Sequence, residues 1–350
     1  MSFDGRTVVG TASGQGFVWS LPTGEDHGAG AWFFFPASQA YTLSDDGALV
    51  AGLSTGAPGI GSTMGRDAID GRNWLGGIPD LVPTFRVTDE FFWGPVRGLS
   101  GNGHIAVGEA RTNVEEHAGF RPGEIVSTFY AEAVIWRLET RSRNRPQSLG
   151  VGYGSQANAV SRNGLVVVGT TPLDGRAFWW TEATRAEPIG DLPGGGASTY
   201  PWALSENGSV IVGSASSKAG TEAFLWTEAE GMTGLGDLPG GRFSSVARAV
   251  SADGTIVVGH GTSEAQGESP GGERAFLWDA KNGMRDLHTV LLQQGVPGEG
   301  LPKDFAKWRL KNAVAIRVTS EGHPQIAGTA IGVKGGQTAF VATLGETVAP

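Results

Sequence analysis

A nine-residue phrase that recurs along the chain constrains the fold more than any other feature. It consists of a Ser or Thr, two further residues, a Gly and an apolar run that ends in Gly, as in SADGTIVVG from Ser251. Asp-Gly and Asn-Gly between apolar runs favour tight hairpin turns. The phrase occurs seven times, once with an extra residue, and its anchor glycines are Gly5, Gly47, Gly103, Gly164, Gly208, Gly254 and Gly322.

Each copy carries four short runs, rich in Val, Ala, Phe and Trp, that are typical of strands. Run a is exemplified by ARAVS, run b by TIVVG, run c by AFLW and run d by GMTGLG. The Trp of run c recurs in register, which predicts that it lies in the core, and Asp191 and Asp237 of the GDLPGG segments are predicted to serve turns. One four-stranded unit cannot bury both of its faces alone, so seven of them predict stacking around an axis. We therefore expect an all-β fold, a seven-bladed β-propeller of four-stranded antiparallel blades, as a single domain over residues 1–350. An elongated solenoid is the alternative.

The phrases GLGDLPGG, ARAVSADGTIVVG and AFLW, together with the tail segments MRDLHTVLLQQG and AFVATL, resemble the HAF family of bacterial extracellular repeat proteins. The resemblance is close from Gly150 to Leu344 and loose from Ser2 to Trp136, where copies two and three lack both the AF before the Trp and the LPGG turn. It implies an exported bacterial propeller, extracellular or periplasmic, of largely unassigned activity.

The ends of the repeat pattern are incomplete. The first copy begins at run b and the last stops after run c, so a first run a and a closing run d are missing. The pattern therefore gives 26 strands, whereas seven four-stranded blades require 28. The first residues show no signal peptide. Within the last copies, DLHTVLLQQG predicts one short helix near 286–295, with Asp as its cap and Gly as its stop. We expect this helix to plug or cover the propeller.

Composition excludes several classes of function. The formal net charge is −9 with no basic run, which argues against nucleic acid or an anionic membrane as the main partner. The chain has no Cys, so disulfides, thiol catalysis and Cys-based zinc sites are excluded. The six His are scattered, and we expect no metal and no cofactor. No apolar run is long enough to insert into a bilayer.

The spacing within the copies separates scaffold from variable loops. From the run-c Trp to the Ser or Thr that begins the next phrase, the distance is 25 or 26 residues in five copies and 41 in the last. From the run-b Gly to the Trp it varies from 9 to 28 residues. The long b–c loops should share one face of a propeller, and function concentrates on loops held by a rigid scaffold. This insertion face is the predicted site, and its loops contribute Arg66, Asp67 and Arg111 as candidate ligand-binding residues.

One position in run a, six residues before each anchor Gly, holds unlike side chains in equivalent places. Aromatic faces stack on sugars, and Arg binds carboxylates or sulfates with two parallel hydrogen bonds. Packing between blades is the alternative explanation. The residues at this position are Tyr41, Arg97, Asn158, Trp202, Arg248 and Ile316.

Candidate acid–base residues also lie in the insertions. Glu109 and His260 stand directly after a run-b Gly, where the other copies have Thr, Ser or Leu. Glu115 and His117 follow in the copy-three insertion, and such groups could serve a glycoside hydrolase or polysaccharide lyase. No spacing rule pairs these residues, and solvated loops are charged without being catalytic.

Three functions therefore stay open at the level of sequence. The first is a binding module that recognises a polysaccharide or a surface protein on the insertion face. The second is a carbohydrate-active enzyme that uses Glu109, Glu115, His117 or His260, with Arg97 and Arg248 holding the substrate. The third is a passive structural or adhesive repeat. The oligomeric state is left open.

Overall fold

The computed structural model describes residues 7–12, 15–20, 31–35, 38–45, 47, 49–54, 69–70, 95–118, 125–138, 146–171, 175–264, 272–294 and 304–345. The chain divides into two compact units. Unit 1 comprises Met1–Leu173 with Phe178–Glu187, and unit 2 comprises Asp174–Ala177 with Pro188–Pro350. The first anchor, Gly5, lies outside the described residues.

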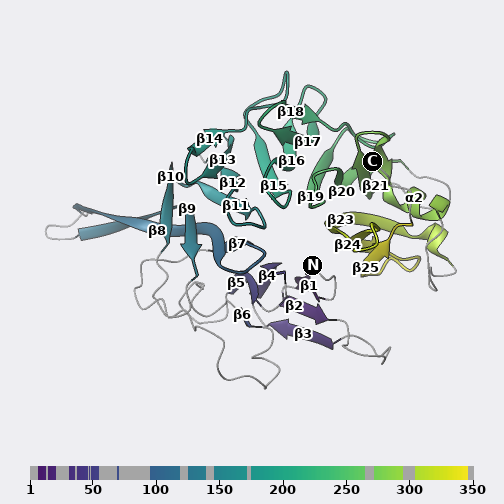
Figure 1. Cartoon of the computed structure of the whole chain (residues 1–350), viewed down its shortest axis with the longest axis horizontal. Helices are drawn as coiled ribbons and strands as arrows, with labels where there is room; N and C mark the ends of the chain where they lie inside the picture. Colours follow the sequence, from purple (N-terminus) through teal and green to yellow (C-terminus); the bar gives the residue numbers. More distant parts are fainter. Residues whose placement is uncertain are drawn as a thin grey trace. The chain divides into compact units, whose positions relative to one another are not determined.

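Unit 1 is built from four sheets whose strands follow one another in sequence order (Figure 1). Two sheets have three described strands and two have four. The first two are β1 (Thr7–Ala12), β2 (Gln15–Ser20) and β3 (Ala31–Phe35), then β4 (Ser38–Leu43), β5 (Leu49–Ser54) and β6 (Ile69–Asp70). The next are β7 (Val96–Leu99), β8 (Ile105–Ala118), β9 (Ile125–Arg137) and β10 (Gln147–Tyr153), then β11 (Gln156–Val160), β12 (Val167–Thr170), β13 (Ala177–Thr181) and β14 (Arg185–Pro188).

Unit 2 continues the same pattern with three sheets. The first two are β15 (Thr199–Leu204), β16 (Val210–Ser216), β17 (Thr221–Thr227) and β18 (Gly231–Gly234), then β19 (Ser245–Val250), β20 (Ile256–Ser263), β21 (Gly272–Asp279) and β22 (Gly283–Asp286). The third is β23 (Arg309–Val318), β24 (Pro324–Ile331) and β25 (Gln337–Thr343). These antiparallel meanders correspond to runs a to d and confirm the all-β class. They have the strand order of β-propeller blades, while the number and closure of the blades stay predictions.

The anchor phrase forms the predicted tight turn between the first two strands of a sheet. In the sixth copy, the Ser251 hydroxyl donates to Asp253 and accepts from the Ile256 amide at 3.0 Å. The Gly254 amide donates to the Ser251 carbonyl at 2.9 Å, and Gly254 has a φ of 81°. Only glycine adopts such a φ without steric cost. The Ser side chain thus satisfies the turn's buried polar groups, which explains why the phrase repeats.

The sheets bury the apolar side chains that the repeat supplies. The Trp of run c was expected in the core, and Trp136, Trp180 and Trp226 are 3%, 2% and 7% exposed. Within unit 1, β11 packs against β7, β8 and β9, and within unit 2, β19 packs against β15, β16 and β17. Successive sheets therefore stack face to face inside each unit.

A short helix stands where the sequence predicts it. Helix α2 (Leu287–Gln294) begins after Asp286, whose carboxylate accepts from the Thr289 amide at 2.8 Å. Its Leu287, Val290 and Leu291 are buried in the core between the last two sheets of unit 2. A 3-10 turn, η2 (Phe305–Lys307), packs beside it. Because its apolar side is packed, α2 acts as part of that core.

The GDLPGG turns connect one sheet to the next. Asp237 accepts from the amides of Leu238 and Ser244 at 2.8 and 2.6 Å, and Asp191 accepts from the Thr199 hydroxyl at 3.0 Å. A Cβ on Gly195 would lie 1.8 Å from the Ser216 carbonyl oxygen, so only glycine fits there. Both Asp residues serve the turn, as the sequence predicted.

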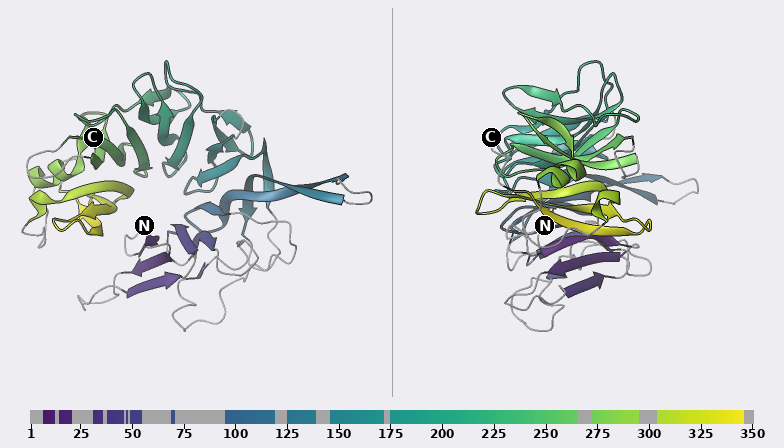
Figure 2. Two further views of the ribbon diagram at one scale, coloured as in Figure 1. Left: turned by 180° about the vertical axis from the view of Figure 1, so that it is seen from behind. Right: turned by 90° about the vertical axis from the view of Figure 1, so that its right-hand side faces the viewer.

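The copy-three insertion differs from its expectation as a loop. It extends β8 and β9 into a long two-stranded hairpin that remains paired as far as Ala118 and Ile125. This hairpin projects well beyond β7 and β10 of its own sheet (Figures 1 and 2). β-Branched residues such as Thr112, Val114 and Val126 suit a strand, and backbone pairing stabilises the extension.

Candidate functional site

The variable position of run a is structurally special, because it is the extra residue of a β-bulge. In the sixth sheet, Ala247 pairs with Gly259 and Ala249 pairs with Val258, which leaves Arg248 without a partner across the ladder. The same interruption occurs in four other first strands, at Tyr41, Arg97, Asn158 and Trp202. Bulges re-aim a side chain away from the ladder. The sequence position thus marks a repeated structural device.

The run-b glycine is required by this bulge. A Cβ on Gly259 would lie 2.0 Å from the Val246 carbonyl oxygen, and one on Gly108 would lie 2.0 Å from that of Pro95. Since backbone occupies the space, the close approach of the two strands requires glycine. The bulge and the glycine therefore form one unit of the scaffold.

The seventh sheet corrects one residue of the predicted row. Ile316 pairs directly with Ile326 and is not the bulge residue. Of the two interruptions in this ladder, the one between Ala313 and Ala315 follows the residue that pairs with the run-b glycine, Gly328, so the equivalent residue is Val314. The β23–β24 hairpin of this copy is longer, and counting back from its anchor Gly322 stops two residues short of the bulge.

The residue that follows the run-b glycine lies against the bulge residue of the same sheet. In the third sheet, Arg97 forms an ion pair with Glu109 at 3.3 Å. In the fifth, the Trp202 indole nitrogen donates to the Ser214 hydroxyl at 3.4 Å. In the sixth, the Arg248 charge lowers the pKa of His260. Two separate sequence signals therefore meet in one place.

The fifth and sixth sheets of unit 2 bring an aromatic and a cation together. The Arg248 guanidinium carbon lies 4.2 Å from the centroid of the Trp202 ring, which is a cation–π contact. Tyr200 lies two residues before Trp202 on the same face of β15, and the two residues are 45% and 38% exposed. Sequence reasoning missed Tyr200, although strand alternation from Trp202 indicates it.

Charged neighbours complete this cluster. His260 on β20 is half-buried, and its Nδ1 finds no hydrogen-bond partner among the described residues. Burial, followed by the charges of Arg248 and Lys311, lowers the pKa of His260, while Glu273 raises it. Glu273 on β21 forms an ion pair with Lys311 on β23 at 3.3 Å. We call Tyr200, Trp202, Arg248, His260, Glu273 and Lys311 the aromatic–cationic cluster.

Arg248 is the cluster's uncompensated charge. Burial lowers its pKa, and it forms no ion pair within the described part of the chain. The charge of Glu273 raises that pKa, but Glu273 is paired with Lys311, so among the described residues the half-buried guanidinium has lost solvation without a carboxylate of its own. Counting Arg248, Lys311 and Glu273, with His260 neutral, the cluster carries one net positive charge.

The predicted acid–base residues of the copy-three insertion lie at different points along strand β8. Glu109 is engaged by Arg97. Glu115 and His117 lie further along β8, opposite Thr128 and Val126, and six strand residues span about 20 Å between Glu109 and Glu115. The backbone pairing of β8 with β9 separates Glu109 from Glu115 and His117 along the strand, and a catalytic role for these residues stays a prediction. Side chains of residues 111–130, including Arg111, lie outside the description.

The remaining candidates are placed only in part. Tyr41 is 41% exposed and Asn158 is half-buried, each at the bulge of its own first strand. Arg66 and Asp67 lie outside the described residues. Within the described ranges, no group of three His, Cys, Asp or Glu could hold a metal ion, and no helix is long and apolar enough to cross a membrane.

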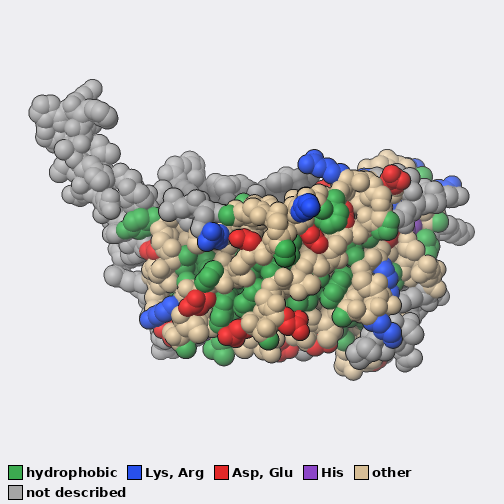
Figure 3. Space-filling model, turned by 90° about the horizontal axis from the view of Figure 1, so that it is seen from above, with side chains coloured by type: hydrophobic (Ala, Val, Ile, Leu, Met, Phe, Trp, Pro, Cys, Tyr) green, Lys and Arg blue, Asp and Glu red, His purple; other side chains and the backbone are tan. Residues whose placement is uncertain are grey.

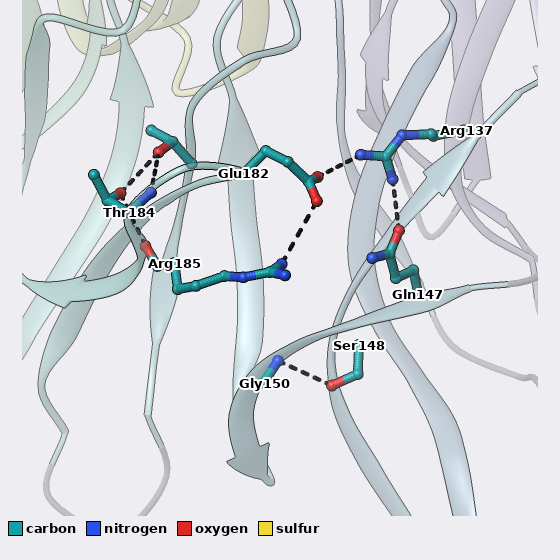
Figure 4. Close-up of polar contacts among 8 residues, drawn as sticks. Arg137, Gln147, Ser148, Gly150, Glu182, Thr184 and Arg185 are labelled. Atoms are coloured by element: carbon teal, nitrogen blue, oxygen red, sulfur yellow. Dashed lines mark hydrogen bonds and ion pairs between the residues drawn. The ribbon is translucent and has the colours of Figure 1, made fainter.

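A second polar cluster in unit 1 was not predicted. Arg137 at the end of β9 donates to Gln147 and to Glu182, both at 2.6 Å, and Arg185 lies 3.6 Å from the other oxygen of Glu182 (Figure 4). These groups are exposed, and such surface pairs contribute about 0–1 kcal/mol each. The cluster bridges the third and fourth sheets, and every charge in it has a partner.

Elsewhere the charges are mixed. On the face seen in Figure 3, acidic and basic side chains of the described residues are interspersed and form no continuous patch of one sign.

Comparisons with known proteins return structural neighbours only. No protein-family model and no curated protein matches the chain. The β-propeller domain of Myceliophthora thermophila Cps50 (Swd1) is 14% identical, with 99% of this chain and 95% of that chain covered and a TM-score of 0.48. The β-propeller domain of the Trilobed protease from Pyrococcus furiosus is 9% identical over 99% and 95%, with a TM-score of 0.46.

TolB from Acinetobacter baumannii is 12% identical over 61% of this chain and 48% of that chain, with a TM-score of 0.36. The chain thus matches about half of the length of that TolB. At these identities and TM-scores the neighbours assign no function. The resemblance to the HAF family stays a prediction.

Proposed function

We propose that the chain is a binding module that recognises a carbohydrate or another cell-surface partner, and that the aromatic–cationic cluster is its binding site. The observation that carries the proposal is the contact between Trp202 and Arg248, beside exposed Tyr200. Exposed aromatic faces provide stacking surfaces for sugar rings, and Arg provides directed hydrogen bonds.

The scaffold proposal accompanies it. Seven repeated meanders, stacked within each unit, support a seven-bladed β-propeller formed by residues 1–350, with HAF-type repeats. We propose an extracellular or periplasmic location, consistent with that resemblance.

The test is a binding screen of the purified chain against a panel of neutral and acidic polysaccharides, scored by calorimetry and by product release. We expect binding without product, and loss of binding in Trp202→Ala. Exposed Leu165, which is 66% exposed on a turn, gives a matched control, and Leu165→Ala should bind normally.

Two results would contradict the proposal. Product release that disappears in Glu109→Gln or His260→Ala would establish a carbohydrate-active enzyme. Failure of every polysaccharide to bind to the folded chain would favour a structural repeat.

A further inference from the structure

The geometry points to an anionic group, a carboxylate or sulfate on a carbohydrate, as the part of the ligand that the aromatic–cationic cluster recognises, with Arg248 as the primary contact. This inference rests on the proposed function and narrows its ligand class.

The first argument is the state of Arg248. Its guanidinium is half-buried, and it has no internal carboxylate among the described residues. A bound anion would supply the charge that burial has removed from contact with water. The nearby carboxylate, Glu273, is already paired with Lys311 at 3.3 Å. With two positive charges, Arg248 and Lys311, and one negative charge, Glu273, the site could accept one further negative charge from a ligand.

The second argument is orientation. The Arg248 guanidinium carbon stands 4.2 Å from the Trp202 ring centroid. Stacking on an aromatic face holds the planar fork of an Arg in place while its N–H groups point outward from the edge. Such a fork matches the two oxygens of a carboxylate or sulfate. Trp202 is thus a positioning residue for Arg248 as well as a surface for the sugar.

The third argument is the donor beside it. His260 is close enough to Arg248 for the arginine charge to lower the pKa of His260, and its buried Nδ1 has no partner within the described ranges. An anion bound at Arg248 would offset that repulsion. Lys311 adds a further positive charge from β23. Arg248, His260 and Lys311 thus come from three strands of unit 2, and the charges of Arg248 and Lys311 both act on His260.

A neutral ligand explains less. Neutral sugars need stacking surfaces and mixed donors and acceptors, which the exposed pair Tyr200 and Trp202 could meet alone. They give no reason for an unpaired Arg in a chain whose net charge is −9. Because the whole chain repels anions weakly, binding of an anion here requires a specific local site.

The experiment uses ligand pairs that differ in charge alone. Oligogalacturonate is compared with its methyl ester, and dextran sulfate with dextran, so that carboxylate and sulfate recognition are distinguished. Calorimetry on the full chain should detect at least tenfold tighter binding of one charged member over its neutral partner. Arg248→Ala should remove that preference, and Arg248→Lys should restore only part of it because the fork is lost.

The control is Arg185→Ala, which removes an exposed arginine that belongs to the ion cluster of unit 1. It should leave the preference unchanged, and circular dichroism should show that every variant is folded. Equal affinity for charged and neutral members would overturn the anionic inference while the binding module stands. Binding of neither member of either pair, nor of any neutral polysaccharide, would overturn the proposed function as well.

Discussion

Two pairs of neighbouring sheets, one in each unit, place an aromatic residue and then an arginine at their bulges, and they differ in the aromatic residue and in the residue after the run-b glycine. In unit 1, Tyr41 on the second sheet is followed by Arg97 on the third. In unit 2, Trp202 on the fifth is followed by Arg248 on the sixth. The residue after the run-b glycine is Glu109 in the first case and His260 in the second.

The second of these differences determines whether the arginine has an ion-pair partner in its own sheet. Glu109 neutralises Arg97 across 3.3 Å, so that sheet satisfies its own charge. His260 is neutral when unprotonated and leaves Arg248 available. A repeat protein can therefore keep one scaffold and create a site by changing one side chain beside an arginine that the scaffold already positions.

The largest expected effect is on folding stability and concerns the β-bulge with its run-b glycine, which both regions share. Gly259→Ala and Gly108→Ala each place a Cβ 2.0 Å from a carbonyl oxygen, and backbone must move to relieve the clash. We expect each to lower the free energy of unfolding by about 3 kcal/mol, at the upper end of overpacking effects. Urea unfolding followed by Trp fluorescence measures this.

Gly336→Ala is the matched control, because no atom lies within 4 Å of its added Cβ. It should change the free energy of unfolding by less than about 0.5 kcal/mol. If Gly259→Ala were as mild as Gly336→Ala, the bulge would not be the rigid frame on which the comparison depends.

The sequence predicts this frame well because its causes are local. A Ser, an Asx-Gly turn and an apolar run fix each hairpin, as the Ser251 turn shows. The same logic placed Trp136 and Trp180 in the core and Asp286 at the start of α2. Where a hairpin lengthens, as in the seventh sheet, counting residues fails, and Val314 replaces Ile316 at the bulge.

The site was predicted only in part, because it depends on contacts between strands distant in sequence. Trp202 and Arg248 were each identified by position, yet the contact between them requires two sheets to stack. The ion pair between Glu273 and Lys311 connects β21 with β23, and neither sequence segment contains a pattern that predicts it. The copy-three insertion forms a hairpin because its two halves pair with each other, and that pairing has no marker in its charged sequence.

The next effect tests the comparison directly by giving unit 2 the chemistry of unit 1. In His260→Glu, a carboxylate beside Arg248 should pair with it, as Glu109 pairs with Arg97. We expect affinity for the preferred charged ligand to fall at least tenfold, about 1.4 kcal/mol. His260→Gln, which adds no charge, should stay within about threefold of wild type by calorimetry. Unchanged affinity in His260→Glu would show that Arg248 does not hold the anion.

A smaller effect is expected from pH. Burial and the charges of Arg248 and Lys311 lower the pKa of His260, while Glu273 raises it. Because the net shift is downward, the imidazole of the free protein is neutral until the pH falls below about 6.5, the ordinary pKa of histidine. A bound anion raises the pKa of His260, so binding takes up a proton. Affinity for dextran sulfate should rise several-fold from about pH 7.5 to about 5.5, where sulfate stays ionised.

Folding stability should depend on pH in the opposite direction to anion affinity. Because the folded pKa of His260 lies below the unfolded value, its contribution to stability is present above about pH 6.5 and is lost as the pH falls. His260→Gln should flatten the pH dependence of binding in calorimetry. A wild-type affinity that is flat with pH, or that falls with acid, would remove His260 from the anion site.

The smallest expected effect comes from the reverse exchange, in which unit 1 loses its carboxylate. Glu109→Gln leaves Arg97 without its ion pair, and since the two side chains are 33% and 19% exposed, the free energy of unfolding should fall by less than about 1 kcal/mol. The freed arginine, at the sheet that follows Tyr41, should gain weak affinity for dextran sulfate. Titration in an Arg248→Ala background isolates this gain, and Arg97→Ala added to it should abolish the gain. If the freed Arg97 binds no anion, an arginine at a bulge is insufficient, and the stacking on Trp202 is what makes Arg248 a site.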